Sequence, residues 1–235
     1  MKVSIIIPVY NEENTIKLVL DKVLSVTLPE GISREVIVVN DGSCDQTAEV
    51  LSPYNDHHNV KILHQVNKGK AAALVRGAAE STGDILLIQD ADLEYDPVQY
   101  PVLLDPILRG EVDVVYGSRF MGEIKDMRWI NKWANRVSNW TLRVLYGVNL
   151  TDVNTCYKVF KRQVIQGIRI CSRNFAFETE VTVKLIRRGI RIKEVPIEYA
   201  ARSYREGKKI RWITALEMYW PIIKYRFYPP SSGAI

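Results

Sequence analysis

Three acidic residues at alternate positions, Asp90, Asp92 and Glu94, directly follow an apolar run in the stretch GDILLIQDADLEYDP. In an extended chain, residues two apart point to the same side, so the three carboxylates would converge if the strand continues through them. Crowded carboxylates repel one another unless a cation compensates their charge, and hard divalent ions prefer such oxygen ligands. The spacing therefore predicts a Mg2+ or Mn2+ site held by Asp90, Asp92 and Glu94. Asp96, directly before a proline, is instead expected to cap a helix.

These acids end the fourth of four apolar runs in the first half of the chain. Runs typical of strands cover residues 2–9, 35–40, 60–65 and 84–89, and stretches with helical periodicity separate them. This alternation predicts an α/β fold with a mostly parallel central sheet flanked by helices. Ligands of such sheets bind at the carboxyl ends of the strands. Polar or glycine-containing segments follow all four runs, so we expect them to line one crevice: PVYNEEN, NDGSCDQT, NKGK and DADLE.

The second half of the chain is less regular. A strand is predicted over residues 112–120, with Arg119 at its exit, followed by a helix over residues 129–147. The apolar positions of that helix share one face: Trp133, Val137, Trp140 and Val144. A short strand over 157–162, a helix over 177–189 and an edge strand that contains Pro196 are expected next. The last aromatic segment is predicted to be helical, with a kink or a break at Pro221.

Composition and charge set broad limits. With 235 residues, 47% hydrophobic and 25% charged, the chain has the composition of an ordinary globular protein. The formal net charge is +5, and much of the basic excess follows residue 119. This suits an anionic partner: a nucleic acid, a phosphorylated small molecule or an anionic membrane surface. The three cysteines show no paired motif, which predicts neither a disulfide framework nor a zinc site.

No segment has the roughly 18 uninterrupted apolar residues that a membrane span requires, and the N-terminal sequence is a poor secretory signal. A cytoplasmic location is therefore expected.

A magnesium ion held by few carboxylates completes its shell with water and substrate phosphates, which points to a nucleotide ligand. The first strand is not followed by GxGxxG, and GKAAALVRG lacks the P-loop spacing, so dinucleotide and P-loop sites have little support.

Five motifs, in this order and spacing, carry a family resemblance: VSIIIPVYNEENTI, EVIVVNDGSCDQT, NKGKAAALVRG, GDILLIQDADLE and VVYGSRF. Together they resemble the family 2 glycosyltransferases with the GT-A fold, and the match covers residues 2–205. Within that family the chain is similar to polyprenyl-phosphate sugar transferases of the dolichyl-phosphate mannose synthase type. The resemblance implies an inverting, metal-dependent transfer of mannose or glucose from GDP-mannose or UDP-glucose. The implied acceptor is a dolichyl or undecaprenyl phosphate.

The resemblance also assigns binding roles to residues of this chain. Those implied to contact the nucleotide sugar are Pro8, Tyr10, Glu12, Asp41, Lys70 and Asp90. Asp41 matches the acid that recognises the base, and Lys70 is expected beside the diphosphate or the sugar. Asp90 and Asp92 match the metal-binding acids, whereas Glu94 stands where the mannose synthases often have glutamine. The chain also has Asn40 where the family usually has a second acid, which leaves base recognition to Asp41.

The implied acceptor site is cationic. Arg119 and Arg202 match the arginines that hold the lipid phosphate, and with Asp92 they form the expected catalytic set. Arg205 and Lys208 are expected to add phosphate contacts. A lipid monophosphate is already an anionic nucleophile and needs positioning by cations, for which guanidinium groups are well suited.

Two alternatives remain open. In the first, the same donor is used with a hydroxyl acceptor on a glycan or glycolipid. That acceptor would need a general base, for which Glu178 and Glu180 are candidates. In the second, the chain is a catalytically silent binding subunit, which predicts that the nucleotide sugar stays intact in the presence of Mn2+. The complete acidic triad favours an enzyme.

We expect a catalytic domain over residues 1–210 and a C-terminal amphipathic segment, aromatic, basic and helical, over residues 211–235. That segment either packs on the core of the enzyme or lies on a membrane, with aromatic groups near lipid headgroups and basic groups facing anionic lipid: Trp212, Trp220, Tyr225, Arg211, Lys224 and Arg226. The expected partners are the nucleotide sugar, the polyprenyl phosphate and a membrane surface or membrane-anchoring protein, without nucleic acid. Peripheral attachment at the cytoplasmic face of a membrane follows.

Overall fold

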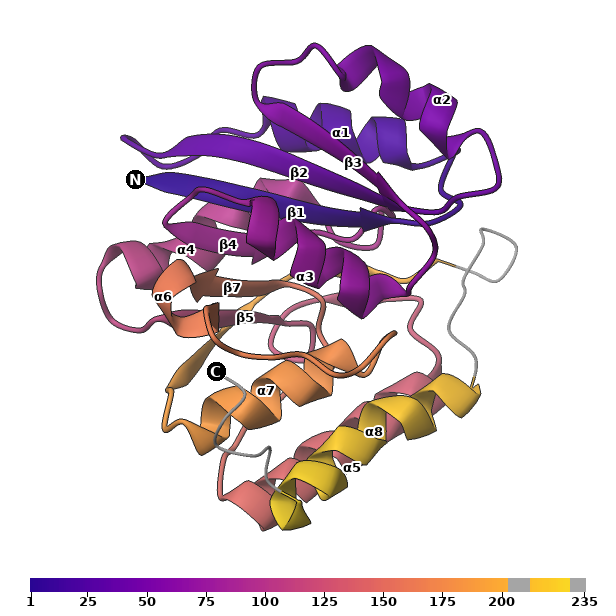
Figure 1. Cartoon of the computed structure of the whole chain (residues 1–235). Coiled ribbons are helices and arrows are strands. Elements are labelled where there is room, and N and C mark those ends of the chain that lie inside the picture. Colours follow the sequence, from indigo (N-terminus) through magenta and orange to yellow (C-terminus); the bar gives the residue numbers. More distant parts are fainter. Residues whose placement is uncertain (203–211, 229–235) are drawn as a thin grey trace.

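The structure, a computed structural model, describes residues 1–202 and 212–228 (Figure 1). Its centre is a seven-stranded sheet in the order β3-β2-β1-β4-β7-β5-β8. The strands are β1 (Lys2–Val9), β2 (Ser33–Asp41), β3 (Val60–Gln65), β4 (Ile85–Ile88), β5 (Val114–Ser118), β7 (Lys158–Lys161) and β8 (Ile192–Pro196). Within this sheet β7 runs antiparallel to β4 and β5, and the other pairs are parallel. The predicted mostly parallel α/β sheet is confirmed, as is the edge position of the strand that contains Pro196.

Helices cover both faces of the sheet (Figure 1). The helices packed on one face are α1 (Ile16–Ser25), α2 (Thr47–Leu51) and α4 (Tyr100–Leu108). Those on the other face are α3 (Lys70–Glu80) and α7 (Phe177–Arg187). Beyond α7, α5 (Trp129–Tyr146) and α8 (Trp212–Phe227) lie side by side. Short elements complete the described fold: η1 (Ser52–Tyr54), η2 (Pro97–Gln99), α6 (Arg162–Ile165) and the paired strands β6 (Ile124–Lys125) and β9 (Tyr199–Ala200).

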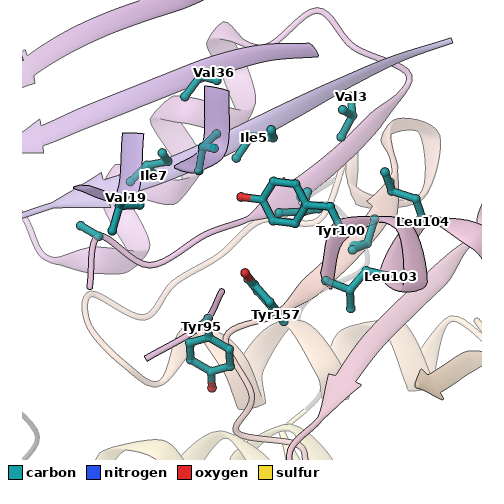
Figure 2. Close-up of a cluster of buried hydrophobic side chains, with 14 of the residues drawn as sticks. Val3, Ile5, Ile7, Val19, Val36, Tyr95, Tyr100, Leu103, Leu104 and Tyr157 are labelled. Carbon is teal, nitrogen blue, oxygen red and sulfur yellow. The ribbon is translucent and has the colours of Figure 1, made fainter. Parts of the chain in front are cut away.

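The core on the α1 side of the sheet is largely hydrocarbon. Alternate residues of β1, such as Ile5 and Ile7, point to this side and lie beside Val19 of α1 (Figure 2). Two buried tyrosines in the same cluster keep their hydroxyls satisfied, because Tyr100 and Tyr157 each donate to the side-chain oxygen of Gln89 at 2.8 Å. Gln89 directly follows β4, so these bonds fix the point where the chain leaves the sheet.

The end of β4 decides where the acidic residues lie. β4 pairs with β1 from Val3 to Ile6 and ends at Ile88, after which the chain bends. Pro8, which has no N–H to donate, is tolerated inside β1 because it lies beyond that pairing. The acids after β4 therefore lie in a bent segment. The prediction that they extend the strand is wrong.

The second half of the chain contains the predicted elements with two corrections. α8 continues through Pro221 as one helix, so the predicted break is not seen. Tyr225, which only the membrane alternative placed near lipid headgroups, is 4% exposed and donates a hydrogen bond to Glu180 at 2.7 Å, because it belongs to the cluster that joins α8 to α5 and α7. The side chains of Arg211 and Trp212 lie outside the described residues. No helix in the described part of the chain is long and apolar enough to cross a bilayer.

Candidate active site

The end of β2 and the segments that follow β1, β3, β4 and β5 meet around a cleft of about 420 Å³, a volume typical of small-molecule sites. The predicted site residues that the structure describes all line it: Pro8, Tyr10, Glu12, Asp41, Lys70, Asp90, Asp92, Glu94, Arg119 and Arg202. Arg205 and Lys208, predicted to bind the acceptor phosphate, lie outside the described residues. Strand ends that are far apart in the sequence therefore supply one site, while the role of each residue stays a prediction.

Lys70, the first residue of α3, is partly buried and lies between two carboxylates. Its Nζ lies 2.7 Å from Asp90 Oδ1 and 3.0 Å from Glu178 Oε1, and it donates to Cys156 Sγ at 3.2 Å. Burial alone would lower the pKa of Lys70 and raise the pKa of Asp90. Their mutual attraction reverses both shifts, so the pKa of Lys70 lies well above and that of Asp90 below its ordinary value. Both groups are therefore charged.

The loop between β3 and α3 positions Lys70, and Asp41 holds that loop. The Asp41 carboxylate accepts hydrogen bonds from the backbone N–H groups of Lys68 at 2.9 Å and of Gly69 at 2.8 Å. Gly69 has a φ of 91°, and a Cβ there would overlap the carbonyl oxygen of Arg173, so no other residue fits. Asp41 thus stabilises the conformation of the loop. Its recognition of a nucleotide base stays a prediction.

Arg202 connects two strand ends across the cleft. Its Nη1 and Nη2 donate to the Glu12 carboxylate at 3.1 and 3.0 Å, and Nη2 lies 3.3 Å from Asp92 Oδ2. Burial, followed by the charges of Asp90 and Glu94, raises the pKa of Asp92 to about 7, although Arg202 opposes that shift. The carboxylates at the end of β4 therefore lack part of the positive charge that would keep them all ionised.

Glu94 has a different set of partners from the other two acids. Its Oε1 accepts the backbone N–H of Arg202 at 2.9 Å, and its Oε2 accepts the hydroxyl of Tyr199 at 2.8 Å. Across residues 1–202 and 212–228, no three acidic, histidine or cysteine side chains are grouped so as to hold a metal ion. The predicted convergence of Asp90, Asp92 and Glu94 is not seen, because the chain bends after β4. Glu94 instead anchors the segment that carries Arg202.

Arg119, at the exit of β5, is held by an acid that the sequence did not indicate. Its Nε and Nη2 donate to the two oxygens of Asp152 at 2.7 Å each, and Nη2 lies 3.4 Å from Asn135 Oδ1 of α5. The guanidinium also lies 5.1 Å from the centre of the Tyr199 ring. Burial alone would lower the pKa of Arg119, but Asp152 holds it well above the ordinary value. Nothing in the spacing of TDVNTC links Asp152 to Arg119, so only the fold reveals the pair.

The two glutamates at the start of α7 differ in their environments. Glu180 accepts the backbone N–H of Ser172 at 2.7 Å and the hydroxyl of Tyr225 at 2.7 Å, so it has a structural role away from the cleft. Glu178 lines the cleft and is 2% exposed. Its Oε1 contacts Lys70, whereas its Oε2 has no hydrogen-bond partner among the described residues. A buried carboxylate oxygen without a partner is costly unless a ligand satisfies it.

A family model identifies the family of the chain. The model described as "Glycosyl transferase family 2" matches residues 4–169, which is more than half of the chain. The chain belongs to glycosyltransferase family 2. The resemblance carried by the five sequence motifs is thereby confirmed, and the protein is a glycosyltransferase.

Curated relatives of this glycosyltransferase are similar over most of its length. The dolichol-phosphate mannosyltransferase of Pyrococcus furiosus is 28% identical over 215 residues, covering 88% of this chain and 59% of that protein. The undecaprenyl-phosphate 4-deoxy-4-formamido-L-arabinose transferase of Pseudomonas aeruginosa is 28% identical over 211 residues, covering 88% of this chain and 60% of that protein. The chain thus spans roughly three fifths of the length of these relatives.

Solved structures agree with the glycosyltransferase fold. The glucosyl-3-phosphoglycerate synthase of Mycobacterium tuberculosis, crystallised with Mn2+, UDP and phosphoglyceric acid, superimposes with a TM-score of 0.74 at 21% identity, covering 99% of this chain and 80% of that chain. A crystal structure of the same synthase with Mg2+ and UDP gives a TM-score of 0.74 at 22% identity, with 99% and 81% coverage. The predicted GT-A fold is confirmed.

The donor groups of the cleft fit a divalent ion. Six carboxylates and three cationic side chains line the described part of the cleft, which leaves an excess of negative charge. Asp90 and Asp92 both contribute to the lining, and their oxygens are the donors that Mg2+ and Mn2+ prefer. Besides burial, the negative charges of Asp90 and Glu94 raise the pKa of Asp92, because a proton on Asp92 reduces the excess of negative charge in the cleft.

Part of the cleft carries no sequence motif that could have indicated it. The lining residues that sequence analysis missed include Tyr95, Asn154, Asn174, Phe175 and Met218. Asn174 and Phe175 lie in the loop before α7, and Met218 belongs to α8, whose packing cannot be read from periodicity. The helix α8 therefore contributes directly to the wall of the candidate active site.

Proposed function

We propose that this glycosyltransferase moves a hexose, mannose or glucose, from a GDP- or UDP-linked donor to the phosphate of a polyprenol, with inversion at the anomeric carbon. The names of the two curated relatives, which refer to dolichol phosphate and undecaprenyl phosphate, support this class of acceptor. The observation that carries the proposal is the cleft itself, where the excess of carboxylates meets two arginines, the buried Arg119 and the partly buried Arg202.

The proposed donor half of the site lies at the ends of β1, β2 and β4. A divalent ion held by Asp90 and Asp92 would neutralise the charge that develops on the departing nucleoside diphosphate. Lys70 would add a fixed positive charge next to the same group, because Asp90 and Glu178 hold its ammonium in place. Pro8, Tyr10 and the Asp41 loop would border the nucleotide.

The proposed acceptor half is formed by the arginines. An oxygen of the lipid phosphate attacks the anomeric carbon from the face opposite the diphosphate, so the new C–O bond forms as the old one breaks. The attacking phosphate is already ionised, so no proton has to be removed. Asp152 orients Arg119, and Glu12 orients Arg202, so both guanidinium groups are preorganised to bind an anion. Arg205 and Lys208 would extend the phosphate site.

The proposed location is the cytoplasmic face of a membrane, where a polyprenyl phosphate would be presented. We assign residues 1–210 to the catalytic domain and residues 211–235 to a C-terminal segment that assists attachment. A membrane-anchoring partner protein would serve the same purpose.

The test is transfer of radiolabelled hexose from GDP-mannose or UDP-glucose to a polyprenyl phosphate in the presence of Mn2+. We expect a product that mild acid cleaves, as a sugar phosphate does. Asp92→Asn should reduce transfer about a thousandfold, since stabilisation of leaving-group charge is worth several kcal/mol. The exposed Asp56→Asn is the matched control and should leave transfer unchanged.

Metal binding needs a readout besides transfer. UDP or GDP together with Mn2+ should raise the midpoint of thermal unfolding of the wild type, because a ligand of the folded state stabilises it. Asp92→Asn should lose the part of the shift that depends on Mn2+. Wild-type transfer that is undiminished in excess chelator would refute the metal-dependent mechanism.

Glu178 favours one alternative, transfer to a hydroxyl group. Its Oε2 has no partner among the described residues, so it could accept the proton of an attacking hydroxyl. In that case Glu178→Gln should abolish transfer to a glycan or glycolipid, and the product should survive mild acid. With a polyprenyl phosphate acceptor, Glu178→Gln should leave substantial transfer, because no general base is needed.

A further inference from the structure

The tryptophans of this chain have an unusual distribution. All five, Trp129, Trp133, Trp140, Trp212 and Trp220, lie in α5 and α8. The four whose side chains are described are exposed, with fractions of 76% for Trp129, 61% for Trp133, 65% for Trp140 and 58% for Trp220. Tryptophan is normally among the most extensively buried residues of a folded protein, so this exposure requires an explanation.

These side chains form two aligned apolar rows, which we call the outer stripe. Its members are Trp129, Trp133, Trp140 and Val144 of α5, with Leu216, Trp220 and Phe227 of α8. Within each helix the members are four or seven residues apart, so they share one face. The opposite faces of both helices turn to a common core through Leu142 of α5 and Ile222 of α8. The helices lie side by side (Figure 1), and each turns its row away from the core that the two share.

The charges around the outer stripe have one predominant sign. α5 contains no acidic residue but carries Lys132, Arg136 and Arg143, of which both arginines are exposed. The described part of α8 adds Lys224 and Arg226 against a single acid, Glu217. An occupant of this surface must therefore accept apolar aromatic groups and carry negative charge.

We infer that the outer stripe is a docking surface for an anionic lipid bilayer, with its tryptophans among the headgroups and its arginines on lipid phosphates. Tryptophan favours the membrane interface, because its ring is apolar and its N–H needs a polar partner. Basic residues beside such rings bind anionic lipid. A second copy of the chain fits poorly, since a symmetric interface would place Arg136 and Arg143 against the same helix, which has no acid to pair with them.

The docking surface lies next to the cleft. Asn135, on the inner face of α5, contacts Arg119 of the candidate active site at 3.4 Å. Met218 of α8 lines the cleft itself. The outer stripe and the cleft are therefore separated by about one helix diameter, roughly 10 Å. This consequence rests on the proposed function: docking would bring the cleft arginines, Arg119 and Arg202, close to acceptor phosphates in the bilayer.

The experiment uses tryptophan fluorescence, since every tryptophan of the chain lies on the two helices concerned. The full chain is mixed with vesicles of phosphatidylcholine, with or without phosphatidylglycerol, that contain no polyprenyl phosphate and no nucleotide. We expect a blue shift of the emission and quenching by brominated lipid, both with the anionic vesicles and both weakened by salt. Unchanged emission at all lipid concentrations would overturn the inference, as would a salt-independent and stripe-independent association.

The variant pair Trp133→Ser with Trp140→Ser tests the stripe directly. We expect at least a tenfold weaker partitioning to anionic vesicles in a sedimentation assay, because two large apolar groups are removed from the contact. The matched control, Leu18→Ser with Val66→Ser, removes two exposed apolar groups elsewhere and should bind vesicles like the wild type. If the stripe variant binds equally well, or if the stripe instead makes the lipid-free protein dimerise, the docking surface is refuted.

The outcome is separable from that of the proposed function. With a short, water-soluble polyprenyl phosphate, the stripe variant should transfer sugar at the wild-type rate. With an acceptor embedded in vesicles, its transfer should fall in parallel with vesicle binding. Vesicle binding without any sugar transfer would contradict the proposed function and leave the docking surface standing, whereas transfer without vesicle binding would do the reverse.

Discussion

The helices α1 and α5 both have apolar residues at helical spacing, but the apolar face of α1 turns to the core and the tryptophans of α5 turn to solvent. In α1, the residues at helical spacing, Ile16, Val19, Leu20 and Val23, are all buried against β1 and β2. In α5, Trp133 and Trp140 are exposed, and the polar side chains of Asn135, Ser138 and Thr141 are among the buried residues. Periodicity therefore identifies an apolar face, but it does not show whether that face turns to the core or to a partner.

The difference extends to the layers around each helix. On the α1 side of the sheet the interior is mostly hydrocarbon, with a few tyrosines bonded to Gln89. Around α5 and α7 the interior holds charged and hydroxyl groups, among them Lys158, Glu178 and Thr182. These groups lie beside apolar clusters, so this side has a mixed interior together with exposed tryptophans. That combination suits a region that must hold a charged substrate on one side and contact lipid on the other.

The largest expected contrast is in stability. Leu20→Ala in α1 should lower the free energy of unfolding by about 3 kcal/mol, because it leaves a cavity in a fully buried cluster. Trp140→Ala in α5 should change it by less than about 0.5 kcal/mol, because the ring is largely exposed. Urea unfolding followed by circular dichroism measures both. Similar losses for the two variants would show that the α5 tryptophans are part of the core after all.

Much of the fold could be predicted from the sequence because its signals are local. β3 matches its predicted range, and Asp96 accepts a hydrogen bond from the backbone N–H of Val98 as an N-cap should, because capping and strand propensity depend on neighbouring residues. The positions of four strand ends also predicted which residues line the cleft.

Other features of the site could not be predicted, because they depend on where the chain turns in space. The spacing of Asp90, Asp92 and Glu94 suggested a shared face, but β4 ends at Ile88, and in the described chain the three acids are not grouped so as to hold a metal ion. The partnership of Arg119 with Asp152 joins segments that no motif connects. Packing of α8 against α5 and α7 likewise decides that Tyr225 is buried and Trp220 exposed.

A second prediction uses a buried lysine on the α7 side of the sheet. Lys158 is fully buried, donates to the carbonyl oxygen of Val153 at 2.9 Å and lies 3.5 Å from the centre of the Tyr116 ring. Burial lowers its pKa to about 7, although the charges of Glu178 and Asp152 oppose the shift. The folded state therefore loses this proton near pH 7, whereas the unfolded state keeps it up to the ordinary pKa of about 10.5.

The sign follows from proton linkage. Between these two pKa values the unfolded state binds more protons, so the stability contributed by this group rises with pH, by roughly 2 to 3 kcal/mol over two pH units. Lys158→Met should remove that rise. The measurement is urea unfolding of wild type and variant across the range from neutral to alkaline pH. Curves that run parallel would show that Lys158 stays charged in the folded protein.

The smallest expected effect tests what holds α5 in place. Thr141 Oγ1 shares a hydrogen bond with the hydroxyl of Tyr219 in α8 at 2.9 Å and donates to the carbonyl oxygen of Val137 at 2.9 Å. Thr141→Val keeps the volume and removes these bonds, so it should cost about 1 kcal/mol, more than the removal of the exposed Trp140 ring. The control is Thr27→Val at an exposed position, where the hydroxyl has no hydrogen-bond partner among the described residues, and it should be neutral.

A double-mutant cycle makes this prediction specific to the contact between α5 and α8. Tyr219→Phe alone should cost no more than Thr141→Val, which also removes the bond to Val137, and the double variant should cost little more than Thr141→Val, because both changes remove the hydrogen bond between the two hydroxyls. Additive losses would show that the two hydroxyls act independently. In that case apolar contacts such as Leu142 with Ile222 would hold α5 against α8. The polar residues on the inner face of α5 would then contribute to the active site and not to the packing of α8.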